Sequence, residues 1–483
     1  MVAKQDFKRV DAYTWELPKG YDPRMQVPAR VYVGEKLLEM AFRDKSIDQL
    51  LNVSMLPGIV KYAMAMPDMH QGYGFPIGGV AAFREDGGII SPGGVGYDIN
   101  CGVRMLASAM DYEDISPYLE ELTTVLYQNC PSGVGKDGAV HLSAKDLNRV
   151  LEDGAEWARK KGYATEDDLL RTESSGRLPG ARAGAVPQRA KERGRPQLGS
   201  LGAGNHFLEI DVVDEVYDPD VAAVFGLAQG RIVTQIHCGS RGLGHEVCSQ
   251  YLRRLQGAPQ RYGFIIPDRE LVATPLDSPE GRDYLAAMYA AANYAFTNRQ
   301  VLAHQMRLSF EKVLAGKVGD WRLRQVYDVT HNIAKLEKHE VAGKPVALIV
   351  HRKGATRAFA PEHPDLPEVY RKTGQPVLVP GSMGTASYVL VGTEHAMTET
   401  FGSTCHGAGR TMSRRQAKRS VRGEQVRTEL NKQGIVVRSG SMRGLAEEAP
   451  LAYKDVSLVV ESVAGAGLAR KVARVVPVAV IKG

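Results

Sequence analysis

Short apolar runs that end in glycine turns recur along the chain and restrict it to a strand-rich fold with tight connections. The chain has 483 residues, of which 51 are glycine. Its N-terminal part gives the pattern in "GGVAAF" and "GGIISPGGVGYDINCG", where apolar stretches of strand length alternate with glycine and proline turns. The glycine clusters therefore predict short strands joined by tight loops, and a site built on those loops rather than a flexible linker.

Helical and buried-strand patterns fill the rest of the chain. Residues 144–160 look helical, and the longest helical pattern runs from 278 to about 314, with Ser278 as the N-cap and Pro279 at the first helical position. The runs "RIVTQIHCG", "VALIVH", "PVLVPGS" and "SYVLVG" predict buried strands. Because no repeat and no strong domain boundary is visible, we expect an α+β fold. It would be a single large catalytic domain over residues 1–483, with a strand-rich core, flanking helices and a loop-built active site.

The composition is that of a globular protein in a reducing compartment. Apolar residues make up 43% of the chain and charged residues 24%, which are ordinary values. The five cysteines are an odd number without a CxxC pair, which argues against a disulfide framework. The start "MVAKQDFKRV" has no apolar signal-peptide core, and no apolar run is long enough to span a membrane. We therefore expect a cytoplasmic protein without a membrane partner.

Basic residues gather in two segments, although the net charge is only +6. The Gly/Pro/Arg-rich stretch 171–200 has six basic residues and one acid between positions 177 and 195, and it predicts a mobile, basic surface insertion at about 165–200. The segment 410–422 has six basic residues, no acid and a helical pattern. Both segments fit a nucleic acid, but a solvated helical face is the usual explanation of a charge run. No RNA-recognition motif, zinc finger or aromatic stacking series accompanies them.

Several potential metal ligands stand at glycine-flanked positions next to apolar runs. Asp98 and Cys101 have a D-x-x-C spacing, so one turn could direct a carboxylate and a thiolate to one point. A thiolate can bridge two transition-metal ions, and His206, His237 and His331 would add imidazoles from other loops. Each histidine alone could be a hydrogen-bonded loop residue, and Cys101 alone a small buried hydrophobe. Their shared setting favours a metal centre, but spacing does not fix how the ligands group.

Glycine-rich segments also offer backbone N–H groups to a phosphate. "GAGNHF" begins like a dinucleotide fingerprint but has Phe207 in place of the last glycine, which excludes a Rossmann site. A Walker A motif and the lysine-centred K-x-D-G motif of common nucleotidyl-transferring ligases are both absent. "VPGSMGT" (379–385) and "HGAGR" (406–410) are candidate phosphate loops, with plain turn chemistry as the alternative. A bound nucleotide would therefore need an unusual architecture.

The segment "GSTCHGAGR" places Cys405 beside His406, and it could form a thiol site, a metal site, a phosphate cradle or a tight turn. Adjacent side chains of an extended chain point to opposite faces, so a Cys405–His406 dyad is unfavourable. His406 is the better candidate to face a pocket, because a neutral imidazole is a good nucleophile toward phosphorus when a partner orients its second nitrogen. Asp68 in "MPDMHQGYG" is the candidate partner, and Arg410 is a candidate phosphate contact.

Six motifs in order resemble those of one family. They are "PDMHQGYGFPIGG", "GGVGYDINCGVR", "GAGNHFLEI", "IHCGSRGLG", "VPGSMGT" and "CHGAGR", and the similarity extends from about residue 20 to the terminal "VIKG". The chain resembles the RtcB-type tRNA-splicing ligases. The resemblance implies the RtcB-like fold and an RNA ligase that joins 2′,3′-cyclic phosphate or 3′-phosphate ends to 5′-hydroxyl ends, using GTP and two Mn²⁺ ions per active site. It also implies a histidine–GMP intermediate and a role in tRNA splicing or RNA repair.

The resemblance assigns roles to individual residues. Asp98, Cys101 and His206 are expected to bind one manganese ion, and Cys101, His237 and His331 the other, with Cys101 bridging. His406 is the expected guanylylated residue, and Asp68 orients it. The expected nucleotide contacts are Asn205, His206, Phe207, Leu208, Glu209, His331, Asn332, Pro380, Gly381, Ser382, Met383, Ser387, His406, Gly407, Ala408, Gly409, Tyr453 and Lys482. Within that set Glu209 and Lys482 would reach the guanine edge, and Tyr453 would stack on the base.

The resemblance also implies binding partners for the protein. The partner would be RNA, either tRNA halves or other broken RNA with 3′-phosphate and 5′-hydroxyl ends, and Arg410, Arg414 and Arg415 are candidate RNA contacts. An archease activator is a further candidate partner. Two alternatives remain open: a manganese-dependent phosphodiesterase that opens cyclic phosphates without ligation, and an RNA-end binding protein that is not an enzyme.

Overall fold

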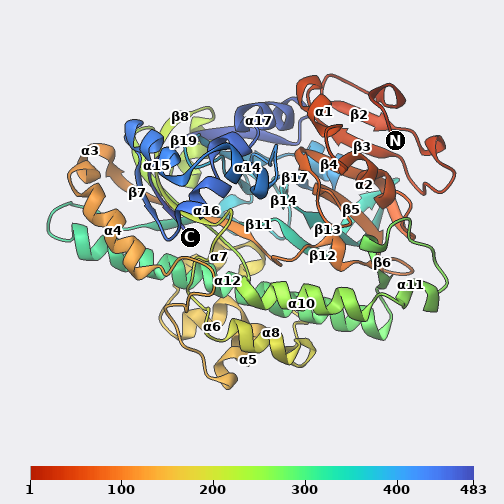
Figure 1. Cartoon of the computed structure of the whole chain (residues 1–483), viewed down its shortest axis with the longest axis horizontal. Helices are drawn as coiled ribbons and strands as arrows, with labels where there is room; N and C mark the ends of the chain where they lie inside the picture. The colour runs from red at the N-terminus through yellow and green to blue at the C-terminus, as the bar shows by residue number, and fades with distance from the viewer. Residues whose placement is uncertain (1) are drawn as a thin grey trace.

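Two large sheets form the core of the computed structural model, which describes residues 2–483. The first has seven strands in the order β1 (Lys8–Arg9), β2 (Thr14–Leu17), β3 (Ala29–Tyr32), β4 (Ile59–His70), β5 (Ile77–Arg84), β13 (Lys344–Lys353) and β12 (Asn332–Val341). The second has eight, in the order β11 (Arg324–Thr330), β7 (Gly102–Asp111), β9 (Arg231–Cys238), β8 (Phe207–Val216), β19 (Ala469–Lys482), β16 (Ser387–Gly392) and β15 (Pro376–Val379), with β18 (Val436–Ser439) parallel to β19. The sheets lie side by side (Figure 1).

Two-stranded ladders and helices surround these sheets. The ladders pair β6 (Ile89–Ile90) with β10 (Thr274–Pro275) and β14 (Ala355–Arg357) with β17 (Ser403–Cys405). The α-helices other than those introduced below are α1 (Glu35–Ala41), α2 (Ser46–Val53), α3 (Tyr112–Ile115), α4 (Leu119–Asn129), α9 (Pro219–Phe225), α10 (Arg241–Arg254), α11 (Ala258–Arg261), α13 (Glu394–Thr400) and α17 (Val456–Gly465). The arrangement confirms the predicted α+β class with a strand-rich core and flanking helices.

The longest helix, α12 (Pro279–Leu314), runs beneath both sheets (Figure 1). The Ser278 hydroxyl accepts the backbone N–H of Gly281 at 3.0 Å, and Pro279 occupies the first turn, so the predicted helix start is confirmed. Its middle is buried on all sides, as a helix enclosed by other layers must be. The predicted strands also form, as β9, β13, β15 and β16.

The predicted helix at 144–160 is two helices, α5 (Ala144–Asp153) and α6 (Ala155–Lys160). Gly154 separates them with a φ of 58°. A Cβ at this position would lie 2.3 Å from the carbonyl oxygen of Gly176, so the close approach of the two segments requires glycine.

The segment 165–200 is folded against the core, although many of its residues are exposed, and its role as an insertion stays a prediction. It forms α7 (Glu166–Leu170) and α8 (Gln188–Gly194), and its Ala190 and Leu198 side chains are fully buried. Asp168 pairs with Arg307 of α12 at 2.6 Å, and the buried Glu173 carboxylate pairs with Lys335 of β12 at 2.5 Å. Composition suggested exposure because glycine, proline and arginine dominate the segment, but a few apolar and acidic residues anchor it to the core.

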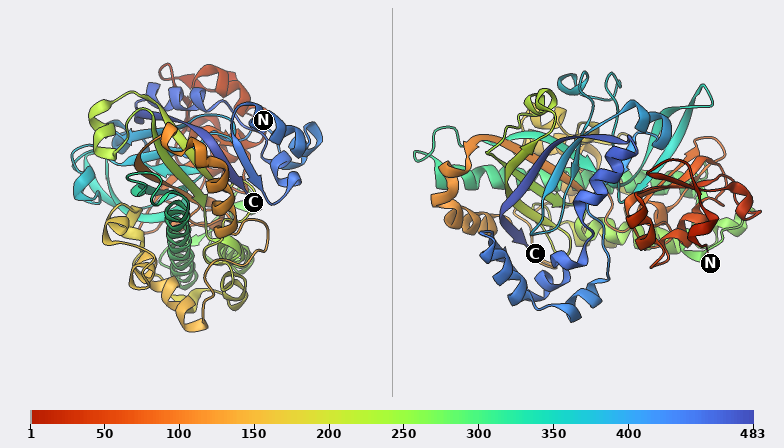
Figure 2. Two further views of the ribbon diagram at one scale, coloured as in Figure 1. Left: turned by 90° about the vertical axis from the view of Figure 1, so that its left-hand side faces the viewer. Right: turned by 90° about the horizontal axis from the view of Figure 1, so that it is seen from above.

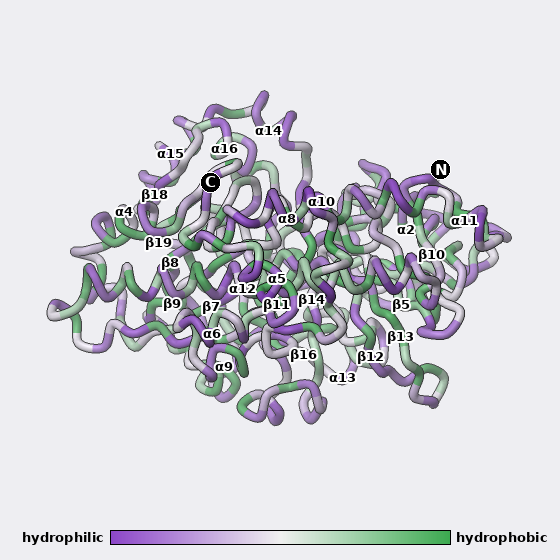
Figure 3. The backbone as a smooth tube through the Cα atoms, turned by 90° about the horizontal axis from the view of Figure 1, so that it is seen from below, coloured by the Kyte–Doolittle hydropathy of each residue, from purple (hydrophilic) through white to green (hydrophobic). Residues whose placement is uncertain are grey.

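A helical segment projects from the body near the C-terminal end of β19 (Figure 2). It consists of α14 (Arg414–Ser420), α15 (Gly423–Lys432) and α16 (Met442–Glu447). Hydrophilic residues cover much of it, as the colouring of Figure 3 shows. Within residues 2–483, no helix has the length and apolar character that a membrane crossing requires.

Candidate active site

Neighbouring strands of the eight-stranded sheet end at one edge and bring five predicted metal ligands there. The order β11, β7, β9, β8 is antiparallel throughout, and Gly102 of β7 pairs with both Thr330 of β11 and Cys238 of β9. Cys101 immediately precedes β7, His206 precedes β8, His331 follows β11, and His237 lies one residue before the end of β9. Strand register therefore gathers ligands that the sequence separates by more than two hundred positions.

The ligands form two groups that share one thiol. Cys101, His237 and His331 make one group and Asp98, Cys101 and His206 the other, with the donor atoms in each group within 4.8 Å of one another. The Cys101 sulfur lies 3.4 Å from His206 Nε2 and 3.3 Å from His237 Nε2. His206 Nε2 lies 2.8 Å from an Asp98 carboxylate oxygen. The grouping is the one that the resemblance implied.

The electrostatics of the cluster suit a divalent cation. Burial raises the pKa of the Cys101 thiol to about 12, so the thiol ionises only beside added positive charge such as a metal ion. Burial and neighbouring imidazoles hold the pKa of His237 and His331 well below the usual histidine value, which leaves both rings neutral with lone pairs for a metal. Burial alone would raise the pKa of Asp98, but His206 lowers it well below the usual range. One thiol, one carboxylate and three imidazoles thus fit borderline transition metals.

The candidate nucleophile His406 is held by Asp68 of β4. Its Nδ1 lies 2.5 Å from Asp68 Oδ2, and the same oxygen accepts the His406 backbone N–H at 2.9 Å. Burial alone would raise the pKa of Asp68, but the facing His406 lowers it, so the carboxylate stays ionised. Asp68 therefore accepts the Nδ1 proton of His406, and Nε2 is the ring nitrogen that lies away from Asp68. The His406 and His331 ring centroids are 4.9 Å apart, which places the candidate nucleophile beside the metal-ligand cluster.

A cavity of about 720 Å³ opens in front of His406. Most of the expected nucleotide contacts line it: Asn205, Phe207, His331, Asn332, Pro380, Gly381, Ser382, Met383, His406, Gly407, Ala408, Gly409, Tyr453 and Lys482. Four do not. His206 belongs to the metal-ligand cluster, Leu208 and Glu209 lie within β8, and the Ser387 hydroxyl accepts the Gly381 backbone N–H at 3.0 Å behind the wall. The predicted role of Glu209 at the guanine edge stays a prediction.

Three backbone N–H groups of "HGAGR" are bonded within the protein. The N–H groups of His406 and Gly407 donate to Asp68 Oδ2, and that of Ala408 donates to the Pro380 carbonyl. Gly409 has a φ of 72°, and a Cβ there would lie 2.1 Å from the Asp68 carbonyl oxygen. The glycines therefore let this loop close onto Asp68, and those three N–H groups are already satisfied. The phosphate-loop role of this segment stays a prediction.

The chain is similar in sequence to one protein family over most of its length. Residues 49–483 match the family model described as tRNA-splicing ligase RtcB. The chain belongs to the RtcB family. The tRNA-splicing ligase RtcB of Thermococcus kodakarensis is 56% identical over 476 residues, which cover 99% of this chain and 98% of that one. The Archaeoglobus fulgidus protein of the same name is 52% identical over 476 residues with the same coverage, and that of Pyrococcus abyssi is 56% identical over 384 residues, 80% of this chain and 42% of that one.

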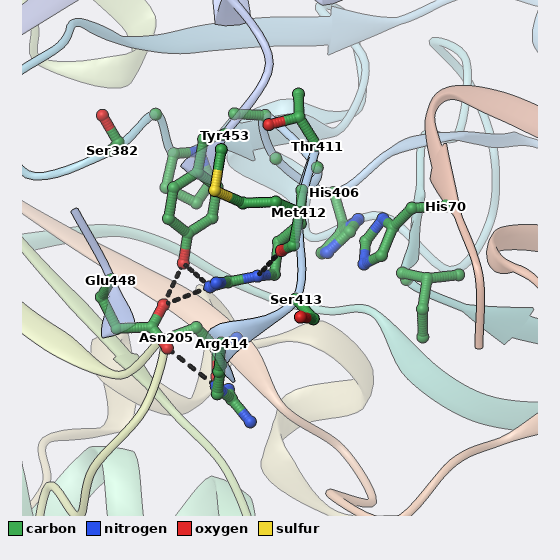
Figure 4. A pocket seen from close by; sticks show the side chains of 18 of the residues that line it. His70, Asn205, Ser382, His406, Thr411, Met412, Ser413, Arg414, Glu448 and Tyr453 are labelled. Carbon is green, nitrogen blue, oxygen red and sulfur yellow. Dashed lines mark hydrogen bonds and ion pairs between the residues drawn. The ribbon is translucent and has the colours of Figure 1, made fainter. Parts of the chain in front are cut away.

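Two residues of the candidate site were not predicted although they contact the backbone at or next to Asp68. The Lys454 ammonium donates to the carbonyls of Pro67 at 3.0 Å and Met69 at 2.6 Å, on either side of Asp68. His70 places Nδ1 3.0 Å from the Asp68 carbonyl oxygen, and burial lowers its pKa to about 4, so the ring is neutral. Figure 4 shows the His70 ring beside that of His406. The motif "PDMHQGYG" contained the signal for His70, whereas nothing in the sequence marks Lys454.

Glu448 is a further unpredicted residue of the cavity wall, and it binds two of the candidate RNA contacts. Its carboxylate pairs with Arg410 Nη1 and Arg414 Nε, each at 2.9 Å, and it accepts the Tyr453 hydroxyl (Figure 4). Arg410 is only 15% exposed, whereas Arg414 is half-exposed and Arg415 is exposed. Arg410 therefore braces Tyr453 and Glu448 in this structure, and Arg415 is the freest of the three to meet an RNA phosphate.

Proposed function

We propose that this protein is a GTP- and manganese-dependent RNA ligase. It would join RNA 2′,3′-cyclic phosphate or 3′-phosphate ends to 5′-hydroxyl ends through a histidine–GMP intermediate, in tRNA splicing or RNA repair. Membership of a family of tRNA-splicing ligases supports the RNA ligase activity. The observation that carries the finer chemistry is the Asp68–His406 pair, because it presents Nε2 to a nucleotide-sized cavity beside a metal-ligand cluster.

Five side chains would hold two manganese ions in the groups described above, with the Cys101 thiolate shared. Bound there, the ions would neutralise phosphate oxygens and favour in-line displacement. Hydrogen bonds within the protein hold the loops that carry these ligands. Asn332 fixes the ligand loops, because its side chain donates to the Asp98 carbonyl at 3.1 Å and accepts the Gly354 N–H at 2.9 Å. Such outer contacts orient metal ligands and tune their affinity.

The nucleotidyl transfer begins at His406, with GTP as a consumed substrate. Nε2 attacks the α-phosphorus, a phosphorus–nitrogen bond forms, and the bond to pyrophosphate breaks. The Asp68 carboxylate stabilises the positive charge that develops on the imidazole. Tyr453 and Lys482, both in the cavity wall, would hold the guanine.

Two further displacements complete the ligation. An oxygen of the RNA 3′-phosphate attacks the phosphorus bound to His406, so the phosphorus–nitrogen bond breaks and the RNA 3′-phosphate carries GMP. The 5′-hydroxyl oxygen then attacks that 3′-phosphate, loses its proton, and displaces GMP to leave a phosphodiester. A 2′,3′-cyclic phosphate would first be hydrolysed to the 3′-phosphate. Activation by archease stays a prediction.

Joining of labelled RNA tests this proposal. An RNA carrying ³²P in a terminal 3′-phosphate, or in a 2′,3′-cyclic phosphate, is mixed with a 5′-hydroxyl RNA, GTP, Mn²⁺ and the protein. We expect a longer product whose label resists phosphatase, because the 3′-phosphate becomes the junction. Opening of a cyclic phosphate without joining would instead indicate the phosphodiesterase alternative. Binding without any change of the ends would indicate the non-enzymatic alternative.

A further inference from the structure

The middle of α12 contacts the backbone next to several metal ligands. Arg299 is fully buried, and its Nη1 donates to the Asn100 carbonyl at 2.7 Å and the Cys238 carbonyl at 2.9 Å. Asn100 directly precedes Cys101, and Cys238 directly follows His237. One guanidinium nitrogen thus ties together the backbones that carry two metal ligands from two strands.

The other donors of Arg299 reach the strand that leads to a third ligand. Nε and Nη2 both bond the Asp328 carboxylate, the latter at 2.8 Å. Asp328 lies on β11, three residues before His331, and is itself fully buried. The planar, forked guanidinium satisfies a carboxylate and two carbonyls at once, which a lysine ammonium at the same site could not do in the same geometry.

Asn298, the preceding residue of α12, contacts the backbone of the segment that leads to a fourth metal ligand, His206. Its Nδ2 donates to the Ser200 carbonyl at 3.1 Å and the Gly239 carbonyl at 3.3 Å, and its Oδ1 accepts the Gly199 N–H at 2.7 Å. The Leu201 carbonyl that follows lies 3.1 Å from Nδ1 of His206 and so orients that ring. Asn298 is also fully buried.

We propose that Asn298 and Arg299 are positioning residues for the metal centre, which set the spacing of its ligands from behind the sheet. The inference rests on the proposed function only in taking the cluster to bind metal. Metal affinity depends on ligand positions held by outer hydrogen bonds, and loss of such a bond commonly lowers affinity 10- to 100-fold. α12 is suited to this task because it packs on β9 and on α4, α5, α6 and α10, and its middle is buried on all sides.

Arg104 provides a matched control. It is fully buried on β7 and bonds the same Asp328 carboxylate at 2.8 Å, but its second bond goes to the Gln300 side chain rather than to ligand-bearing backbone. Arg299→Lys and Arg104→Lys therefore disturb the same buried carboxylate. Only Arg299→Lys removes the contacts to the Asn100 and Cys238 carbonyls.

Cobalt(II) binding to the full-length protein tests the proposal, with the sulfur-to-cobalt charge-transfer band as the signature of the Cys101 ligand. We expect Arg299→Lys and Asn298→Ala to bind Co²⁺ at least about tenfold more weakly and with a shifted band. Arg104→Lys should keep the wild-type band and affinity. Thermal unfolding and circular dichroism establish that each variant is folded.

The outcomes separate the two proposals. A wild-type protein that gives no charge-transfer band would overturn the metal centre itself. A normal band and affinity in folded Arg299→Lys and Asn298→Ala would overturn the positioning role alone, as would an equal loss in Arg104→Lys. If Arg299→Lys does not fold, Asn298→Ala decides, because that change leaves no charge in the core.

Discussion

The Asp68 carboxylate contacts both the ring and the backbone of His406, so one side chain fixes the tautomer and the position of the candidate nucleophile. The Lys454 ammonium bonds the backbone carbonyls on either side of Asp68. The His70 ring contacts the backbone carbonyl of Asp68 itself. The Lys454 backbone N–H also donates to the Gly409 carbonyl at 2.9 Å. At the scale of single residues, the nucleophile is therefore one member of a buried network that joins β4 to the loop after β17.

Replacing Asp68 by asparagine tests the orienting role. Asp68→Asn retains the size of the side chain but loses the charge and can stabilise the wrong tautomer of His406. We expect the rate of protein–GMP formation to fall about 100-fold or more, as when a catalytic histidine loses its carboxylate partner. Cys405→Ala is the control, because Cys405 is buried next to His406 and outside the cavity. Rates of Asp68→Asn equal to those of Cys405→Ala would refute the role of Asp68.

The basic residues at and just before helix α14 differ in their contacts and exposure, which a count of charges in the sequence does not show. Arg410, before its start, is tied to Glu448 and to the Tyr453 hydroxyl, whereas Arg415 in its first turn is exposed. The resulting prediction concerns the salt dependence of RNA binding. Arg415→Ala should reduce the slope of log K against log salt by about one phosphate contact, and Arg410→Ala should leave the slope unchanged. The reverse pattern in a salt titration would show that Arg410 turns toward RNA.

Strand β8 buries a carboxyl group whose ionisation should oppose folding. Burial raises the pKa of Asp211 to about 7, although Gln235 donates to its carboxylate at 3.0 Å. Because the folded-state pKa lies above the ordinary value of 3.8, the folded protein binds more protons between these values. Stability from this group is therefore complete at acidic pH and is lost as pH rises through about 7.

Asp211→Asn removes that titration. Near pH 8 we expect the variant to be more stable than the wild type by up to about 4 kcal/mol, with the difference shrinking toward pH 5. Thermal unfolding midpoints measured across this range provide the check. A variant that is destabilised equally at both ends would mean that Asp211 contributes through its hydrogen bond rather than its charge.

At the scale of the whole molecule, the site joins residues from the N-terminal sheet, the central strands and the C-terminal loops. The sequence allowed the strand-forming runs, α12 and the ligand groups to be predicted, because local patterning and the family motifs mark them. It did not reveal that 165–200 packs around α12, nor the contacts that Glu448, Lys454 and Arg299 make around the site. Their partners lie far away in the chain, and burial of a single charge leaves no local pattern.

The shared thiol gives a prediction about metal content. Because Cys101 belongs to both ligand groups, Cys101→Ala should lose both metal ions rather than one. Cys130→Ala is the control, since Cys130 is also buried but belongs to neither ligand group. Elemental analysis of the purified, Mn²⁺-treated proteins measures the stoichiometry. Retention of one full equivalent by Cys101→Ala would argue against the bridge.

Transfer of GMP to His406 tests the central claim most directly. The protein is incubated with Mn²⁺ and GTP labelled at the α-phosphate, denatured, digested and analysed by mass spectrometry. The account predicts a covalent, acid-labile and base-stable GMP on His406, which is absent from His406→Ala. No label on the wild-type protein, or label that persists in His406→Ala, would contradict it.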